Sequence, residues 1–203
     1  MQPNRPITLG TVVAGLALIA TPLQAQTAIQ FTAGAISSGV LVNDGALHTK
    51  LRPAAAPTFG LGIALPTGKG PYRVRFEAHY TRSTLNITTT EGLTDHLSSL
   101  TTIDVVAMAE GPLTGDVRWQ AGGGALFYRP SEHQGVFLNG PVQRWLLAGG
   151  AVYSRRLTPR LSLLISGRVD AHAFQTDVLR ARNYAGSQGV QRFALSLGVE
   201  KQF

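Results

Sequence analysis

Apolar and polar residues alternate along most of the chain, and the alternation is clearest in its last fourteen residues, VQRFALSLGVEKQF. One face of this stretch is apolar: Phe193, Leu195, Leu197, Val199 and Phe203. The other face is small, polar or charged: Arg192, Ala194, Ser196, Gly198 and Glu200. A period of two residues predicts a β-strand, because successive side chains of a strand point to opposite faces.

Eight segments of the chain show this period. They are Ala28–Val42, Thr58–Leu65, Tyr72–Leu85, Ser99–Glu110, Asp116–Arg129, Val142–Arg155, Leu161–Phe174 and Val190–Phe203. The connections between them, rich in Gly and Pro as turns require, are alternately long and short. In a meander, that rhythm brings the four long loops to one end and the three short turns, with both termini, to the other. The pattern predicts an all-β fold, an eight-stranded antiparallel up-and-down transmembrane β-barrel, whose interior is just wide enough for side chains to fill.

The N-terminal segment reads as a secretory signal peptide. Arg5 precedes an apolar run over about residues 7–20, and small residues lead to a cleavage site after Ala25. A membrane anchor is the alternative, but the run is shorter than the roughly 20 residues that span a bilayer. We therefore predict a signal peptide at 1–25 and a barrel domain at 26–203. The chain has no Cys, which excludes disulfides and attachment as a lipoprotein.

The chain is basic, with a formal net charge of +7 that becomes +6 once the segment containing Arg5 is removed. The arginines are scattered singly rather than gathered in a basic run or helix, so we expect no nucleic-acid partner. Two loops hold clusters that together make a basic mouth, a candidate site for anionic lipopolysaccharide or another polyanion. These residues are His48, Lys50 and Arg52 in the first loop and Arg180, Arg182 and Tyr184 in the fourth.

One face of the predicted strands carries charges of both signs. Its residues form the predicted interior polar network: Arg73, Arg75, Glu77, His79, Asp104, Arg118, Arg168, Asp170, His172, Arg192 and Glu200. A narrow interior holds charges only when they are paired, so we expect salt bridges across it and a plugged barrel rather than an open channel. Parity alone does not say which face is inside, and a soluble barrel with an apolar interior is the alternative.

Aromatic residues on the apolar face decide between the two arrangements. Near the short turns lie Tyr72, Trp119, Tyr153 and Phe203, and near the long loops lie Phe59, Tyr80, Phe127, Trp145 and Phe193. Two aromatic girdles that border an apolar band are typical of the lipid-facing surface of a membrane barrel. The strand length between them, about 9–11 residues, suits a tilted strand that crosses a bilayer.

The topology, the girdles and the terminal Phe203 together resemble the small OmpA/OmpX-type outer-membrane β-barrels of Gram-negative bacteria. In that family the C-terminal aromatic is the signal that the barrel-assembly machinery recognises, although Lys201 stands where the family usually has an apolar or aromatic residue. The resemblance implies a bacterial outer-membrane location with the signal peptide removed, the long loops extracellular and the termini periplasmic. It also implies contact with outer-membrane lipid and lipopolysaccharide, and we expect a monomer.

Catalytic chemistry finds little support. Ser166, Asp170 and His172 share a face, but residues even four apart along a strand lie about 13 Å apart, so Ser166 and His172 are too distant for direct contact. The lipid A deacylases, which are also eight-stranded barrels, need a Ser two residues after a His, whereas Phe174 follows His172 at that spacing. We predict no catalytic, cofactor-binding or metal-binding residues, and no cofactor.

The leading functional hypothesis is therefore a non-enzymatic integral outer-membrane barrel that stabilises the membrane or presents its loops for recognition. The alternatives are a narrow pore for ions or small solutes, a lipid A-modifying barrel enzyme, and a soluble periplasmic barrel that binds an apolar ligand.

Overall fold

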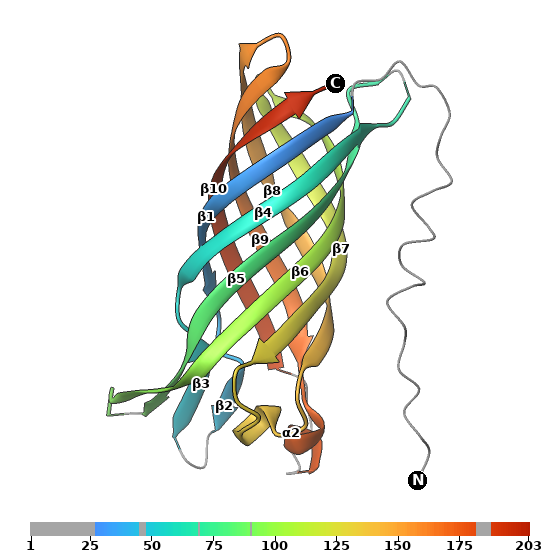
Figure 1. Ribbon diagram of the computed structural model, residues 1–203. Coiled ribbons are helices and arrows are strands. Elements are labelled where there is room, and N and C mark those ends of the chain that lie inside the picture. The colour runs from blue at the N-terminus through green and yellow to red at the C-terminus, as the bar shows by residue number, and fades with distance from the viewer. Residues whose placement is uncertain (1–26, 45–47, 69, 90, 182–187) are drawn as a thin grey trace.

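The computed structural model describes residues 27–44, 48–68, 70–89, 91–181 and 188–203, and in this part of the chain a single antiparallel sheet curves into a tall cylinder (Figure 1). Eight strands form the ring: β1 (Ala28–Ser38), β4 (Ala56–Pro66), β5 (Arg73–Thr89), β6 (Thr94–Thr114), β7 (Val117–Pro130), β8 (Val142–Thr158), β9 (Leu161–Phe174) and β10 (Gln188–Gln202). Four short elements lie at one end: β2 (Val42–Asp44), β3 (Thr49–Pro53), the 3-10 helix η2 (Gly135–Phe137) and α2 (Asp177–Ala181). The predicted eight-stranded up-and-down barrel is confirmed. The predicted signal peptide, residues 1–25, lies outside the described residues.

The ring is closed by pairing between its first and last strands. β1 runs antiparallel to β10, from Ala28 opposite Gln202 to Ser38 opposite Arg192, and it pairs with β4 on its other side. The remaining ring strands each pair antiparallel with two neighbours. Because the backbone groups of the wall bond to one another, such a wall can face lipid without unsatisfied N–H and C=O groups.

The two ends of the cylinder differ. The turn end carries the short connections and the C-terminus, where the Phe203 amide donates to the Thr27 carbonyl at 3.0 Å. The loop end, at the bottom of Figure 1, carries β2, β3, η2 and α2. The meander thus separates short from long connections, as the spacing of the strands predicts.

At the loop end the strands differ from those expected. The first strand ends at Ser38 rather than Val42, and the expected loop over residues 43–57 contains most of the β2–β3 hairpin. The expected loop over residues 86–98 is largely strand, since β5 continues to Thr89 and β6 begins at Thr94. A β-bulge between Leu85 and Asn86 shifts the register and lets the pairing continue.

These extensions form because they bury apolar side chains at the mouth of the barrel. Leu51 of β3 lies opposite Ile87 of β5, and Leu51 and Leu85 are buried. They belong to a hydrophobic core that lies mainly in the loop half of the interior. The buried members of this core are Leu41, Val42, Leu51, Leu85, Leu100, Val106, Met108, Leu126, Tyr128, Phe137, Leu146, Ala148, Phe174, Leu179 and Val190.

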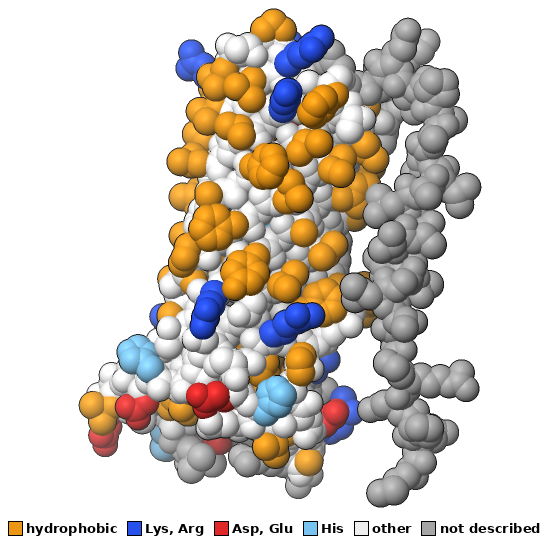
Figure 2. Space-filling model, in the orientation of Figure 1, with side chains coloured by type: hydrophobic (Ala, Val, Ile, Leu, Met, Phe, Trp, Pro, Cys, Tyr) orange, Lys and Arg blue, Asp and Glu red, His pale blue; other side chains and the backbone are white. Residues whose placement is uncertain are grey.

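The outer wall is apolar over most of its height. In Figure 2 hydrophobic side chains cover the cylinder, with basic side chains at the two borders of the band. The exposed apolar residues of this band include Phe31, Leu61, Ile63, Phe76, Val105, Leu147, Ile165, Val169, Leu195, Leu197 and Val199. An exposed apolar surface of this extent marks a membrane-facing wall. Among the described residues, no helix is long and apolar enough to cross a membrane.

Candidate functional site

The turn half of the interior is filled by a cluster of ion pairs around Glu110. Glu110 Oε2 accepts from Arg75 Nε at 2.7 Å and from Gln120 Nε2 at 3.1 Å, while its Oε1 accepts from Arg73 Nε at 2.8 Å. Glu200 lies on the opposite side of the same two arginines, accepting from Arg73 Nη1 at 2.8 Å and from Arg75 Nη2 at 3.1 Å. Both carboxylates are thus shared between the same pair of guanidinium groups, which is the pairing that buried charges require.

Two more polar groups complete this cluster. Arg118 Nε lies 2.5 Å from Glu110 Oε1 on the side that faces the turn end. Glu77 accepts a hydrogen bond from Gln30 Nε2 and lies 3.7 Å from Arg75 Nη1. The cluster therefore extends from the rim at the turn end to the middle of the barrel.

A second cluster, centred on Asp104, occupies the middle of the barrel. Asp104 accepts from Arg168 Nη2 at 2.9 Å and from Arg192 Nη2 at 3.0 Å, and its Oδ1 lies 2.9 Å from His79 Nδ1. Arg168 also contacts Asp170, with its Nε 2.9 Å from Oδ1. His79 packs over Gly60, where an added Cβ would lie 2.5 Å from His79 Cδ2, so a side chain at residue 60 would collide with the ring.

The polar interior ends where the hydrophobic core begins. The Tyr128 hydroxyl and His172 Nε2 are 2.6 Å apart, and both residues are buried. On its other side the Tyr128 ring packs edge-on against Phe174, with the centroids 5.4 Å apart. From the turn end to the mouth, the interior thus holds the Glu110 cluster, the Asp104 cluster, the Tyr128–His172 pair and most of the hydrophobic core, of which Val106 and Met108 lie between Glu110 and Asp104 along β6.

The structure brings together the residues predicted as an interior network. In the described part of the chain, the interior ion pairs join five arginines (Arg73, Arg75, Arg118, Arg168 and Arg192) to five carboxylates (Glu77, Asp104, Glu110, Asp170 and Glu200). Their formal charges cancel. His79 lies among them, whereas His172 bonds to Tyr128.

Glu110, the most shared carboxylate, was missing from that network, as were Gln30, Gln120 and Tyr128. Glu110 has 0% exposure. The sequence predicts that a strand ends at Glu110, before the turn that begins with Gly111 and Pro112, but β6 continues past it to Thr114. The sequence does contain a signal for Glu110: it is an even number of residues from Asp104, so the two side chains point to the same face of the strand.

The three residues of a hydrolytic triad do not assemble. The Ser166 hydroxyl lies 2.7 Å from the Ser196 hydroxyl, while Asp170 is bound to Arg168 and His172 to Tyr128. In the described ranges no group of three or more His, Cys, Asp or Glu side chains is arranged to hold a metal ion.

The predicted girdle aromatics lie on the outer wall. Those most exposed are Trp145, Phe203, Phe59, Phe193, Tyr72 and Tyr80, whereas Trp119, Phe127 and Tyr153 are partly exposed. Toward the loop end, Phe59 lies opposite Tyr80, Tyr80 opposite Ile103 and Ile103 opposite Phe127. At the turn end, Gly111 lies under the rings of Tyr72 and Trp119, since an added Cβ would lie 2.8 Å from each.

Two arginines lie on the outer wall just beyond the aromatic girdle at the loop end. Thr101 of β6 pairs with Arg82 of β5 on one side and with Arg129 of β7 on the other. Both arginines are exposed. Arg82 is two residues beyond Tyr80 and Arg129 is two residues beyond Phe127, a rise of roughly 6.6 Å along each strand. The two guanidinium groups therefore flank one strand at the border of the apolar band.

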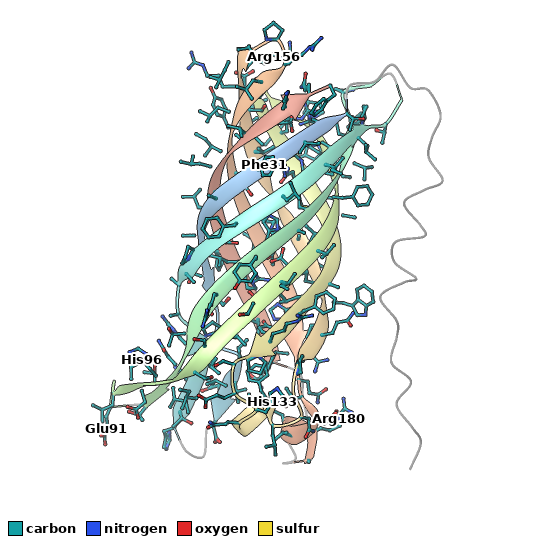
Figure 3. All side chains as sticks on the ribbon, viewed as in Figure 1. Phe31, Glu91, His96, His133, Arg156 and Arg180 are labelled. Atoms are coloured by element: carbon teal, nitrogen blue, oxygen red, sulfur yellow. The ribbon has the colours of Figure 1, made fainter. Side chains whose placement is uncertain are left out.

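The structure describes part of the two basic loop clusters. Lys50 and Arg52 are exposed on β3, and Arg180 of α2 lies 3.6 Å from Asp177 in an exposed ion pair. His48 adopts a left-handed backbone conformation with φ of 50°. Figure 3 places Arg180 at the loop end together with His133, while Arg156 lies at the turn end. Arg182 and Tyr184 lie outside the described residues.

A cavity of about 290 Å³ opens in the hydrophobic core at the loop end. Its walls come from the β2–β3 hairpin, the β5–β6 hairpin, the segment around η2 and helix α2. Residues from η2 and α2, Phe137 and Leu179, are buried and form part of the cavity lining. Sequence reasoning missed this cavity, because its walls meet only when several loops fold against one another.

Comparisons with known proteins agree with this geometry. No family model and no curated protein matches the sequence. Similar solved structures include OprG from Pseudomonas aeruginosa (TM-score 0.52, 10% identity, covering 88% of this chain and 96% of OprG) and the Neisserial surface protein NspA (0.51, 16%, covering 87% and 97%). A third is Ail from Yersinia pestis, solved in complex with the heparin analogue sucrose octasulfate (0.50, 13%, covering 89% and 100%).

At these identities the likeness concerns the fold. The fold is that of the small eight-stranded outer-membrane β-barrels of the OmpA/OmpX-like type, as the sequence predicts. The apolar outer wall and the polar groups of the interior support this fold independently of the comparisons, because a membrane barrel places apolar side chains outward and polar ones inward.

Proposed function

We propose that this protein is a non-enzymatic integral outer-membrane barrel with a sealed interior, whose role is carried out at its cell-surface end and by its contacts with lipid. The observation that carries the proposal is the filled interior. Ion pairs occupy the turn half, and fully buried apolar side chains such as Leu100, Leu126 and Phe174 occupy the loop half. A pore would require these groups to separate, which would leave charges unpaired in the barrel.

The proposed orientation places the loop end outside the cell and the termini in the periplasm. It is supported by the lengths of the connections, because outer-membrane barrels have short periplasmic turns and longer extracellular loops. An epitope inserted after Gly92, in the β5–β6 hairpin, should bind antibody on intact cells. The same epitope inserted after Gly115, between β6 and β7, should bind only after the outer membrane is permeabilised. The reverse result would invert the orientation.

Lipopolysaccharide is the proposed lipid partner at the loop end. Arg82 and Arg129 support this, because two exposed guanidinium groups at the border of the apolar band are suited to phosphate groups at the membrane surface. The partner proposed during assembly is the barrel-assembly machinery, which would recognise Phe203, an exposed side chain at the C-terminus. The closed ring needs no second copy to satisfy its strand edges, which supports a monomer.

The sealed interior is tested by conductance. The mature chain is reconstituted into planar bilayers, with a general porin incorporated in the same way as the positive control. We expect no stepwise conductance above the leak of protein-free bilayers, because the ion pairs around Glu110 and Asp104 block the axis. Regular single-channel steps would overturn the proposal in favour of a narrow pore. Mass spectrometry of lipid A from cells with and without the protein tests the enzymatic alternative, and the two spectra should be identical.

A further inference from the structure

We propose that the cavity at the loop end, here named the mouth cavity, is a binding site for a small apolar molecule that is neutral or positively charged. The inference rests on the proposed function in one respect only: the loop end must be the accessible, outward-facing end. The mouth cavity is lined by Val42, Asp44, Thr49, Leu51, Leu85, Ile87, Leu97, Ser98, Glu132, Gln134, Gly135, Val136, Phe137, Val178 and Leu179.

The lining of the mouth cavity favours an apolar ligand. Most lining side chains are aliphatic or aromatic, and they come from segments as distant in sequence as Val42 and Leu179. Four separate loop segments thus fold together and leave a space instead of closing over it, although protein interiors are normally close-packed. A concave apolar site with a few polar groups is the usual form of a small-molecule site.

The charged groups restrict the ligand further. Among the described residues that line the cavity, the charged side chains are Asp44 and Glu132, which are both acidic, and none is Lys or Arg. Glu132 is exposed and accepts a hydrogen bond from Gln134 Nε2. A carboxylate-bearing ligand would therefore meet acidic side chains, whereas a hydroxyl or ammonium group could bond to the carboxylate of Glu132.

The volume sets the size of the ligand. An apolar cavity of about 150 Å³ is large enough to bind benzene. The mouth cavity, at about 290 Å³, has space for roughly twice that, which corresponds to a chain of about eight carbons or two fused rings.

The floor of the cavity keeps the ligand at the mouth. Phe137, which lines the cavity, packs against Phe174 with the ring centroids 5.8 Å apart, and Phe174 and Leu126 have 0% exposure. Beneath them lies the hydrogen-bonded Tyr128–His172 pair, followed by the ion pairs of the Asp104 cluster. An apolar molecule has no path along the barrel axis, so the site serves capture at the surface rather than axial passage.

The test uses three probes with the same chain length and different head groups: 1-octanol, octylammonium and octanoate at pH 7. The full mature chain, with labelled Leu and Val methyl groups, is placed in nanodiscs of zwitterionic lipid and titrated by NMR. We expect saturable shifts at the methyls of Leu51, Leu85 and Leu179 with 1-octanol and octylammonium, and at least tenfold weaker binding of octanoate. The lipid-facing Leu61 and Leu195 are internal references, which should show only the non-saturating shifts caused by partitioning into lipid.

A matched pair of variants tests whether binding depends on the cavity wall itself or on the β5–β6 hairpin in general. Leu97→Asp places a third carboxylate in the cavity wall, at a side chain with 47% exposure that should tolerate it. Leu93→Asp makes the same change on the same hairpin, at 65% exposure and outside the cavity lining. We expect L97D to weaken 1-octanol binding at least tenfold and L93D to change it less than twofold.

Equal, non-saturating shifts at the cavity and lipid-facing methyls would overturn the inference, as would equal effects of the two variants. Octanoate binding as tightly as 1-octanol would overturn the ligand class. These outcomes are distinguishable from failure of the proposed function, because the conductance and epitope measurements do not depend on any ligand.

Discussion

The removal of one negative charge at Glu110 is the perturbation that most directly tests how the interior is held together. Glu110→Gln keeps the length and shape of the side chain but removes its charge. In the variant, Arg73 would keep Glu200, Arg75 would keep Glu200 and the more distant Glu77, and Arg118 would lose its ion-pair partner. The three guanidinium groups are buried or largely buried, with side-chain exposures of 12%, 1% and 25%.

The expected loss follows from the contacts. Glu110 accepts charge-assisted hydrogen bonds from Arg73 at 2.8 Å and from Arg75 at 2.7 Å. Each such bond contributes about 1.5–3 kcal/mol, which gives about 3–6 kcal/mol for the two. Breaking a buried ion pair by removing one partner costs about 3–5 kcal/mol. We therefore expect E110Q to lower the free energy of unfolding by about 3–5 kcal/mol.

The assay is equilibrium unfolding in guanidinium chloride, with the barrel folded into lipid vesicles and followed by tryptophan fluorescence. The matched control is Glu91→Gln at the exposed tip of the β5–β6 hairpin (Figure 3), which should change the free energy of unfolding by less than about 0.5 kcal/mol. Adding Arg73→Met to E110Q should restore part of the loss, because it removes one of the unpaired cations. A loss below about 1 kcal/mol for E110Q would refute the view that this network stabilises the barrel.

Three further predictions concern the outer wall and the C-terminus. Replacing Arg82 and Arg129 together by Ser should weaken binding of purified lipopolysaccharide to the reconstituted barrel by about 1–2 kcal/mol, or roughly 5–30-fold, in a titration at low salt. Leu61→Arg in the apolar band should lower the free energy of unfolding in vesicles by about 2–4 kcal/mol, whereas Leu113→Arg near the end of β6 should lower it by about 0–1 kcal/mol. Phe203→Ala should slow assembly in cells, measured as a larger fraction of unfolded chain in a pulse-chase gel, while leaving the unfolding free energy of the purified barrel within about 1 kcal/mol.

Each of these predictions has a result that would contradict it. Equal weakening of lipopolysaccharide binding by Ser at Arg155 and Arg156, near the turn end, would make the effect one of net charge and not of position. Equal destabilisation by the two arginine substitutions would remove the support for a membrane-facing band. Unchanged assembly of the Phe203→Ala chain would mean that the terminal aromatic is not the assembly signal.

The part of the fold that follows the two-residue period could be predicted from the sequence. The segment from Tyr72 to Tyr80 alternates apolar and charged residues strictly, and the structure places the apolar residues outward and the charged residues inward. The period says only that two faces differ. The position of the aromatics at both borders of the band indicated which face meets lipid, because membrane barrels place aromatic residues at the interfaces.

The mouth could not be predicted in the same way. Phe137 and Leu179 lie in connections that carry no period, and Leu41 lies past the end of β1, so the three become a core only when the loops meet. The sequence predicts a loop where most of the β2–β3 hairpin forms, because Leu51 is the single aliphatic residue of Thr49–Pro53 and no alternation is evident. Its pairing with β5 depends on tertiary contacts that a local pattern does not record.

The interior network could be predicted from the sequence only in part. The parity of each strand predicted which charges share the lumen, but parity gives no information on how strands are offset from one another. That offset decides that Arg168 reaches Asp104 across the barrel, although the two residues are far apart in sequence. Glu110 was missed for a local reason: it stands next to Gly111 and Pro112, which read as the start of a turn and not as the continuation of β6.

The central claim, that this chain is a closed outer-membrane barrel, is tested most directly by heat-modifiability. The full chain is expressed in a Gram-negative host, the outer-membrane fraction is isolated, and boiled and unboiled samples are compared on mildly denaturing gels. We predict that the protein is found in the outer membrane and that the unboiled form migrates differently from the boiled form, because the closed ring resists SDS until it is heated. Recovery of the protein as a soluble periplasmic species would contradict this claim, because the apolar outer wall would then have to face water instead of lipid.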